Sequence, residues 1–172
     1  MQHLSILLVE DVELNVVVAI SILEKQGHYV DVAMNGEQAI RLFEKNTYDI
    51  VFLDIKLPDM SGFDIAYYLR KKYEEGIYDF LPPLIAFTAN VMHSEEEYQE
   101  QGMDGVLRKP LSLVELRQCF KTFLGDDIEC ISDEEETPQV QEGINISLIE
   151  LIGKSQAKAN VELFKQWMPI YL

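Results

Sequence analysis

The sequence predicts an α/β fold, in which a doubly wound sheet of five parallel strands is covered by helices, followed by a short helical segment at the carboxyl end. Five short apolar runs alternate with five segments whose apolar residues recur at helical spacing, which is typical of β-α-β units. The first run, LSILLV at residues 4–9, is apolar at nearly every position, as expected for a strand buried on both faces.

The first half of the chain contains three predicted strands and two predicted helices. We expect strands at residues 4–9, 29–33 and 50–53, and helices at residues 14–25 and 37–45. Gly27 ends the first helix, and Asn35-Gly36 forms a turn before the second. Apolar residues of the second helix, including Ile40 and Phe43, share one face that can pack on the sheet.

The second half of the domain continues the alternation. We expect helices at residues 61–73, 94–101 and 113–123, a strand at residues 84–87 and a short strand around residues 106–107. Ser61 and Ser112 can cap the first and last of these helices. The helix at 94–101 is acidic and expected to be exposed, whereas Leu116 and Phe120 give the last helix an apolar face.

The composition argues against several functions. The chain has 172 residues with 30 acids and 14 bases, and its net charge of −16 argues against direct nucleic-acid binding. The longest strongly apolar run, residues 16–23, is far shorter than a membrane span, and residues 1–3 lack the basic start of a secretory signal. Cys119 and Cys130 have no metal-like spacing and are expected to be free thiols of a cytosolic protein.

The charge is concentrated after the predicted sheet. Residues 126–142 carry eight acids and no bases, which makes this segment too polar to bury a core. We therefore expect a folded domain at 1–125, an acidic flexible linker at 126–143 and a helical segment at 144–172. Within the last segment, Val161, Phe164 and Met168 recur at helical spacing.

Polar residues occupy the carboxyl ends of the predicted strands. Glu10 and Asp11 follow the first strand and Asp54 ends the third. Thr88 ends the fourth strand and Lys109 follows the fifth. Because sites in parallel α/β sheets gather at the carboxyl ends of the strands, we expect these five side chains at one edge.

The chemistry of that edge suits a metal and a phosphoryl group. Three carboxylates brought together repel one another, so at least one should hold its proton more tightly than usual. A hard divalent cation such as Mg²⁺ relieves this repulsion. With the hydroxyl of Thr88 and the ammonium of Lys109, the set suits phosphoryl transfer to an aspartate.

Four motifs follow one another at these strand ends: Glu10-Asp11, Asp54 with LPDMSG at 57–62, Thr88-Ala89 and Lys109-Pro110. In this order they resemble the receiver domains of two-component signalling, over residues 4 to about 125. The resemblance implies a flavodoxin-like receiver fold in which Asp54 accepts the phosphoryl group.

The resemblance also implies the metal ligands. Asp54 and Asp11 would bind Mg²⁺ directly, Glu10 would bind it through water, and Lys56 would contribute its main-chain carbonyl. The receiver itself would catalyse only its own aspartyl phosphorylation and dephosphorylation.

Further roles follow from the same resemblance. Thr88 would move to the phosphoryl group, Lys109 would pair with it, and the Lys109–Pro110 peptide bond would be cis. Asn90 and Lys56 would flank the site and tune hydrolysis of the acyl phosphate. Many receivers carry Tyr or Phe three residues before the lysine. Val106 stands there, which suggests a receiver that relays phosphate rather than one that drives a large surface change.

The stretches VEDVELNVVVA, DIKLPDMSGFDI and GMDGVLRKPLS are most similar to the receivers of hybrid sensor histidine kinases. This resemblance implies that residues 144–172 begin a histidine phosphotransfer domain. The histidines at positions 3, 28 and 93 all precede this segment, and no ATP-binding segment is visible, so we expect a fragment without the kinase core.

The expected partners are therefore a histidine kinase domain and a phosphotransfer domain, without nucleic acid and without direct membrane contact by this fragment. The expected location is the cytoplasm, with the parent protein anchored in the bacterial inner membrane.

Other functions remain open at this point. Enzymes of the haloacid dehalogenase type share the strand-end aspartate, but they carry an acid two residues later, where this chain has Lys56. The domain could also be a docking or regulatory module without efficient relay, or a free response regulator. Structural alternatives are that Thr88 caps a helix and that Lys109 is an ordinary surface lysine.

Overall fold

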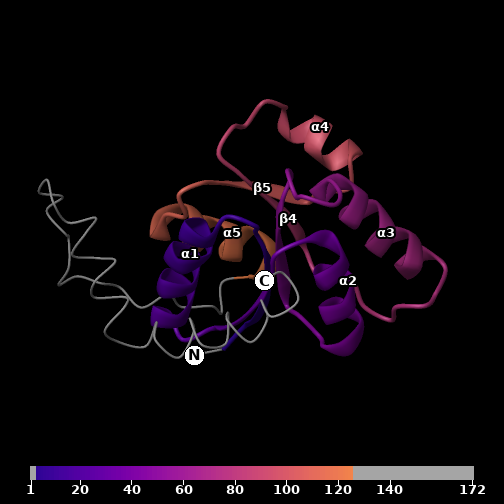
Figure 1. The fold of residues 1–172 in the computed structure, drawn as a ribbon, viewed down its shortest axis with the longest axis horizontal. Coiled ribbons are helices and arrows are strands. Elements are labelled where there is room, and N and C mark those ends of the chain that lie inside the picture. The colour runs from indigo at the N-terminus through magenta and orange to yellow at the C-terminus, as the bar shows by residue number, and fades with distance from the viewer. Residues whose placement is uncertain (1–2, 126–172) are drawn as a thin grey trace, which may run out of the picture. The chain divides into compact units, whose positions relative to one another are not determined.

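The computed structural model describes residues 3–125 of the chain, and strands and helices alternate throughout this part (Figure 1). The elements are, in order, β1 Ser5–Val9, α1 Glu13–Lys25, β2 Tyr29–Ala33, α2 Gly36–Lys45, β3 Ile50–Asp54, α3 Gly62–Glu74, β4 Leu84–Thr88, α4 Glu95–Glu100, β5 Gly105–Arg108 and α5 Leu113–Leu124. The predicted order of strands and helices is confirmed.

All neighbouring strands are parallel, and the sheet order is β2-β1-β3-β4-β5. This order confirms the predicted doubly wound, five-stranded parallel sheet. The direction of winding reverses between β1 and β3, which lie side by side with Val9 paired to Leu53. The carboxyl ends of β1 and β3 therefore meet at the switch point, where open α/β sheets bind ligands.

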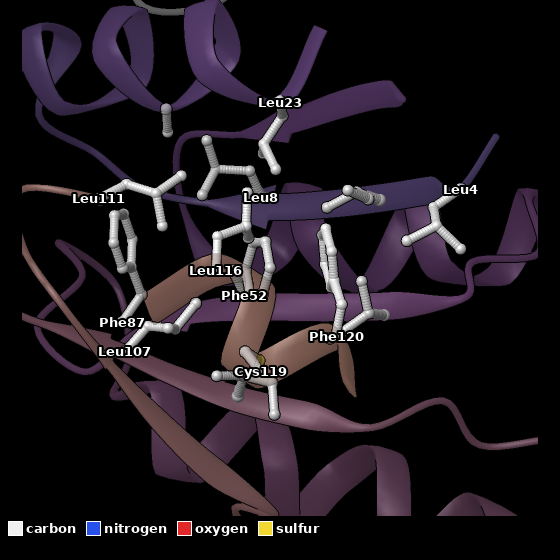
Figure 2. Packing of buried hydrophobic residues seen from close by; sticks show 14 residues of the cluster. Leu4, Leu8, Leu23, Phe52, Phe87, Leu107, Leu111, Leu116, Cys119 and Phe120 are labelled. Atoms are coloured by element: carbon white, nitrogen blue, oxygen red, sulfur yellow. The ribbon is translucent and has the colours of Figure 1, made fainter. Parts of the chain in front are cut away.

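The sheet is buried on both faces because its central strands are apolar at successive positions. One set of alternate residues, including Leu8, Phe52 and Phe87, packs with residues of α1 and α5 in a single apolar cluster (Figure 2). The opposite set faces α2, α3 and α4, which lie on the other side of the sheet in Figure 1. Cys119 is a free thiol buried among the residues that pack with α1 and α5, and burial raises the pKa of its thiol to about 12.

Serine side chains define the helix starts that the sequence predicted. The Ser61 hydroxyl accepts a hydrogen bond from the Phe63 N–H and forms a capping box with Asp64. Ser112 accepts from the N–H of Glu115 at the start of α5. Such caps satisfy N–H groups that have no partner within the helix.

Several predictions concern residues outside the described part of the chain. The linker at 126–143, the helical segment at 144–172 and the thiol of Cys130 all belong to this group. Between residues 3 and 125, none of the helices combines the length and apolar content needed to cross a membrane.

His28 connects the amino-terminal end of β1 to α5. Its ring is 4% exposed and packs edge-on against Phe120, with ring centroids 5.3 Å apart. The Leu4 N–H donates to Nδ1 over 3.1 Å, so Nδ1 must be unprotonated. Nε2 has no hydrogen-bond partner among the described residues. Burial lowers the pKa of His28, His3 adds to this effect, and Asp49 opposes it.

The lowered pKa of His28 predicts an acid-sensitive contribution to stability. In the unfolded chain the pKa returns towards 6.5, so the unfolded state binds more protons as the pH falls. The contribution is complete above about pH 6.5 and decreases below it, by at most about 1.4 kcal/mol per pH unit.

Urea unfolding from about pH 7.5 down to about pH 5 tests this expectation with His28→Gln, whose amide oxygen can still accept from the Leu4 N–H. The variant should lose less free energy of unfolding than the wild type as the pH falls. Groups elsewhere titrate in both proteins, so equal losses in the two would contradict the role of His28.

Candidate functional site

Three carboxylates meet at the carboxyl ends of β1 and β3. Glu10, Asp11 and Asp54 each offer a carboxylate oxygen, and these atoms lie within 4.8 Å of one another. Glu10 is fully buried and Asp54 is 6% exposed, whereas Asp11 is half-buried. The structure thus brings together the acids that the sequence predicted at this edge.

The backbone at the end of β3 fixes the position of Asp54. The Asp54 Oδ1 atom accepts from the Lys56 N–H over 3.1 Å, and the Gly62 N–H donates to the Ile55 carbonyl over 2.9 Å. A Cβ atom on Gly62 would lie only 2.2 Å from the Asp54 carbonyl oxygen. Only glycine therefore allows the start of α3 to approach the backbone of Asp54 this closely.

Lys109 supplies the positive charge of the site. Its Nζ lies 3.1 Å from Asp54 Oδ2, contacts Glu10 Oε2 and lies 5.2 Å from the centre of the Phe87 ring. The side chain is only 9% exposed, so the alternative of an ordinary surface lysine is wrong. The Lys109–Pro110 bond is cis, as predicted.

The pKa values of Asp54 and Asp11 are raised, which confirms the prediction that at least one acid of the site holds its proton more tightly than usual. Burial is the largest cause of the raised pKa of Asp54, followed by the charge of Glu10, while Lys109 opposes both. Burial is also the largest cause of the raised pKa of Asp11, which Asp54 raises further and Lys109 lowers. The cause assigned from the sequence was repulsion between the acids. The structure corrects it, because removal from water contributes more.

Thr88 ends β4 beside the site, since it follows Phe87, the register partner of Asp54. Its hydroxyl donates to the Asn90 carbonyl over 3.1 Å and accepts from the Asn90 N–H over 3.3 Å. Ser94 caps α4, so the alternative that Thr88 is a helix cap is wrong. The hydroxyl is therefore bonded to the backbone of the loop that follows β4.

The other predicted residues lie around this centre. Lys56, Asn90 and Pro110 are exposed. Lys56 is bonded to Asp54 through its N–H, and Asn90 is bonded to Thr88.

Sequence reasoning missed the role of Asp59 within the LPDMSG motif. Its carboxylate accepts from the N–H of Gly36 over 2.8 Å and from that of Glu37 over 3.0 Å. An anion at a helix N-terminus is favoured by the free N–H groups and by the helix dipole. Asp59 therefore ties the loop after β3 to the start of α2, more than twenty residues away in sequence.

Comparison with known families decides the identity of the domain. Residues 6–121 match the model of the response regulator receiver domain.

The chain belongs to this family.

Relatives of this receiver include long sensor kinases. The aerobic respiration control sensor protein ArcB of Escherichia coli K12 is 44% identical over 175 residues, which cover 98% of this chain and 22% of that protein. The sensor histidine kinase AruS of Pseudomonas aeruginosa is 39% identical over 118 residues, covering 68% of this chain and 12% of the kinase. The chain therefore spans about a fifth or less of the length of these relatives.

A solved receiver domain is similar in both sequence and fold. It comes from a sensor histidine kinase of Pseudomonas aeruginosa and was crystallised with a magnesium ion coordinated in its active-site cleft. Its TM-score is 0.62 at 32% identity, with 73% of this chain and all of that chain covered.

The three acids of the receiver fit a hard divalent cation. They present oxygen donors within a few ångströms of one another, and Glu10 and Asp54 are buried beside a single lysine. The pKa values of Asp54 and Asp11 are raised because the positive charge and hydrogen bonds of the protein do not fully offset the cost of burying the ionised carboxylates. A bound cation would further offset this cost.

Gly62→Ala sets two effects of opposite sign against each other. Alanine favours a helix by about 1 kcal/mol relative to glycine, but the new Cβ would overlap the Asp54 backbone, where overpacking costs about 1–3 kcal/mol or more. We expect the overlap to dominate and the free energy of unfolding to fall by about 2 kcal/mol.

Ser61→Ala is the matched control, since it removes the neighbouring cap at a cost of about 1 kcal/mol and leaves Asp54 in place. Urea unfolding measures both variants. A Gly62→Ala protein more stable than the wild type would contradict the close approach.

Asp54→Asn should increase the free energy of unfolding at about pH 8 without divalent ions, because the fold no longer buries this anion. The penalty in the wild type is complete above the raised folded pKa of Asp54 and disappears below the ordinary value of 3.8. The advantage of the variant should therefore shrink as the pH falls.

Thermal unfolding with and without millimolar Mg²⁺ checks the same assignment. The ion should raise the melting temperature of the wild type more than that of the variant, because it would bind the folded state through the acids. A variant less stable than the wild type at about pH 8 would count against the electrostatic account.

Proposed function

We propose that residues 1–125 form a phosphorelay receiver that accepts one phosphoryl group on Asp54 and passes it to a phosphotransfer histidine. The observation that carries the proposal is the geometry of Asp54. Its carboxylate ends a buried strand, lies 3.1 Å from the Lys109 ammonium and shares the edge with Glu10 and Asp11. Membership of the receiver family supports it.

The transfer uses Asp54 as the nucleophile. A carboxylate oxygen forms a bond to phosphorus while the bond from phosphorus to the donor imidazole nitrogen breaks, and the electron pair of that bond remains on the imidazole. The carboxylate must be ionised to attack. Its raised pKa opposes ionisation, so the Lys109 charge, which lowers this pKa, contributes directly to reactivity.

Asp11, Asp54 and the Lys56 carbonyl would hold Mg²⁺ directly, and Glu10 would hold it through water. When bound, the ion supplies positive charge against the acids and the incoming phosphoryl oxygens. Once the phosphoryl group is attached, Lys109 pairs with one of its oxygens, since Nζ already lies beside Asp54 Oδ2. The Thr88 hydroxyl leaves the Asn90 carbonyl and donates to another oxygen.

The rest of the receiver tunes and presents this centre. Asn90 and Lys56 are exposed beside it and influence access of water to the acyl phosphate, and Pro110 shapes the turn after Lys109. Val106, in place of an aromatic residue, favours a relay over a large change of the surface.

The partners are a histidine kinase domain and a histidine phosphotransfer domain, reached in the cytoplasm without nucleic acid. Val12 and Leu14, at 48% and 56% exposure, come one and three residues after Asp11 and give this end of the sheet an apolar surface for these partners. In the proposed organisation, residues 126–143 are a linker and residues 144–172 are the start of a phosphotransfer domain. The whole fragment belongs to a longer kinase that is anchored in the membrane.

Intact mass spectrometry after incubation with acetyl phosphate and Mg²⁺ tests the proposal. The wild type should gain one phosphoryl group, and Asp54→Asn should gain none because the amide cannot form the acyl phosphate. Asp64→Asn, a change of an exposed acid shortly after the same loop, should behave as the wild type. Chelation of Mg²⁺ should slow the gain at least tenfold.

Phosphorylation of the Asp54→Asn protein would contradict the assigned acceptor. A wild type that binds Mg²⁺ without gaining mass would contradict the proposed transfer and favour a docking or regulatory module.

A further inference from the structure

Three aromatic rings from different elements meet near the starts of α3 and α4, which follow the strands that end in Asp54 and Thr88. Phe63 begins α3, His93 belongs to the loop between β4 and α4, and Tyr98 lies on α4. The ring centroids of His93 and Tyr98 are 5.5 Å apart at an interplanar angle of 82°, and those of Phe63 and His93 are 6.3 Å apart at 69°. Phe63 and Tyr98 are 5.9 Å apart, so each ring contacts the other two.

The ring cluster joins the segments that follow β3 and β4, the strands that end in Asp54 and Thr88. Phe63 directly follows Gly62, whose lack of a side chain lets α3 start against the Asp54 carbonyl. His93 lies five residues after Thr88, in the loop that follows β4. Tyr98 is only 2% exposed, which makes it a rigid support for the other two rings.

Polar contacts fix the backbone beside His93. The Glu97 Oε2 atom accepts from the Ser94 N–H over 2.8 Å and lies 3.4 Å from His93 Nδ1. The Ser94 hydroxyl in turn accepts from the Glu97 N–H over 3.2 Å. Residues 89–92 are exposed, whereas His93, although 52% of its side chain is exposed, packs against the other two rings. The loop after Thr88 is therefore held on the domain from its His93 end.

We propose that His93 is a positioning residue for phosphoryl transfer, because its ring, packed against Phe63 and Tyr98, holds the loop whose Asn90 backbone binds the Thr88 hydroxyl. This inference rests on the proposed function. His93 touches neither the phosphoryl group nor its acceptor, and it acts through Thr88. Without the ring, the loop samples more arrangements, and the hydroxyl spends less time within reach of the phosphoryl oxygens.

The test compares rates of phosphoryl gain from acetyl phosphate with saturating Mg²⁺, measured by intact mass. His93→Ala removes the ring and should slow the gain about threefold to tenfold, the range expected from losing aromatic contacts. His93→Phe keeps a ring in the cluster and should stay within about twofold of the wild type. Met92→Ala, at the exposed neighbouring position, should also leave the rate unchanged.

The melting temperature of each variant is measured alongside its rate of phosphoryl gain. If His93→Ala does not fold, His93→Leu is used in its place. A His93→Ala rate within about twofold of the wild type would overturn the inference, even with a lower melting temperature, since that combination is purely structural. Slow transfer in His93→Phe, or equal slowing in Met92→Ala, would overturn it as well. A wild type that gains no mass would overturn the proposed function, and this inference with it.

Discussion

The carboxylates of Glu10 and Asp54, which water barely reaches, share the single ammonium group of Lys109. A buried anion without a counter-charge is costly, so the ends of β1 and β3 and the loop after β5 must come together at this point. The strand order allows it, because β1 lies beside β3 and Lys109 reaches both across the Phe87 ring of β4. The single positive charge of Lys109 cannot neutralise three carboxylates. The remaining negative charge favours the binding of a cation at this edge of the sheet.

The site is held by contacts that lie outside the charged centre. Gly62 admits the start of α3 against Asp54, and Asp59 binds the loop after β3 to the N-terminus of α2. Rigid support of this kind keeps reactive groups in place without ordering them at the moment of reaction. The electrostatic cost at Asp54 is thereby offset by packing and hydrogen bonding elsewhere in the sheet and helices.

Much of this architecture could be predicted from the sequence, because the signals are local. Apolar runs locate the strands, Ser61 and Ser112 mark helix starts, and polar residues after the strands mark the site. Contacts between distant segments could not be predicted. The bond from Asp59 to the Gly36 N–H has no local pattern, and the leading effect of burial on the pKa of Asp54 depends on the packed environment. Alternation likewise does not reveal which face of the sheet α1 and α5 cover.

The hydrogen bond between Thr88 and the Asn90 carbonyl has an energetic consequence. A hydroxyl that turns to a new acceptor exchanges one hydrogen bond for another, so the free-energy difference is that between two acceptors. Asn90 is exposed, and water can replace the hydroxyl at its carbonyl. If Asp54 accepts a phosphoryl group as proposed, the free-energy change of turning the hydroxyl is therefore much smaller than the energy of a whole hydrogen bond, and the new negative charge would favour the turned orientation.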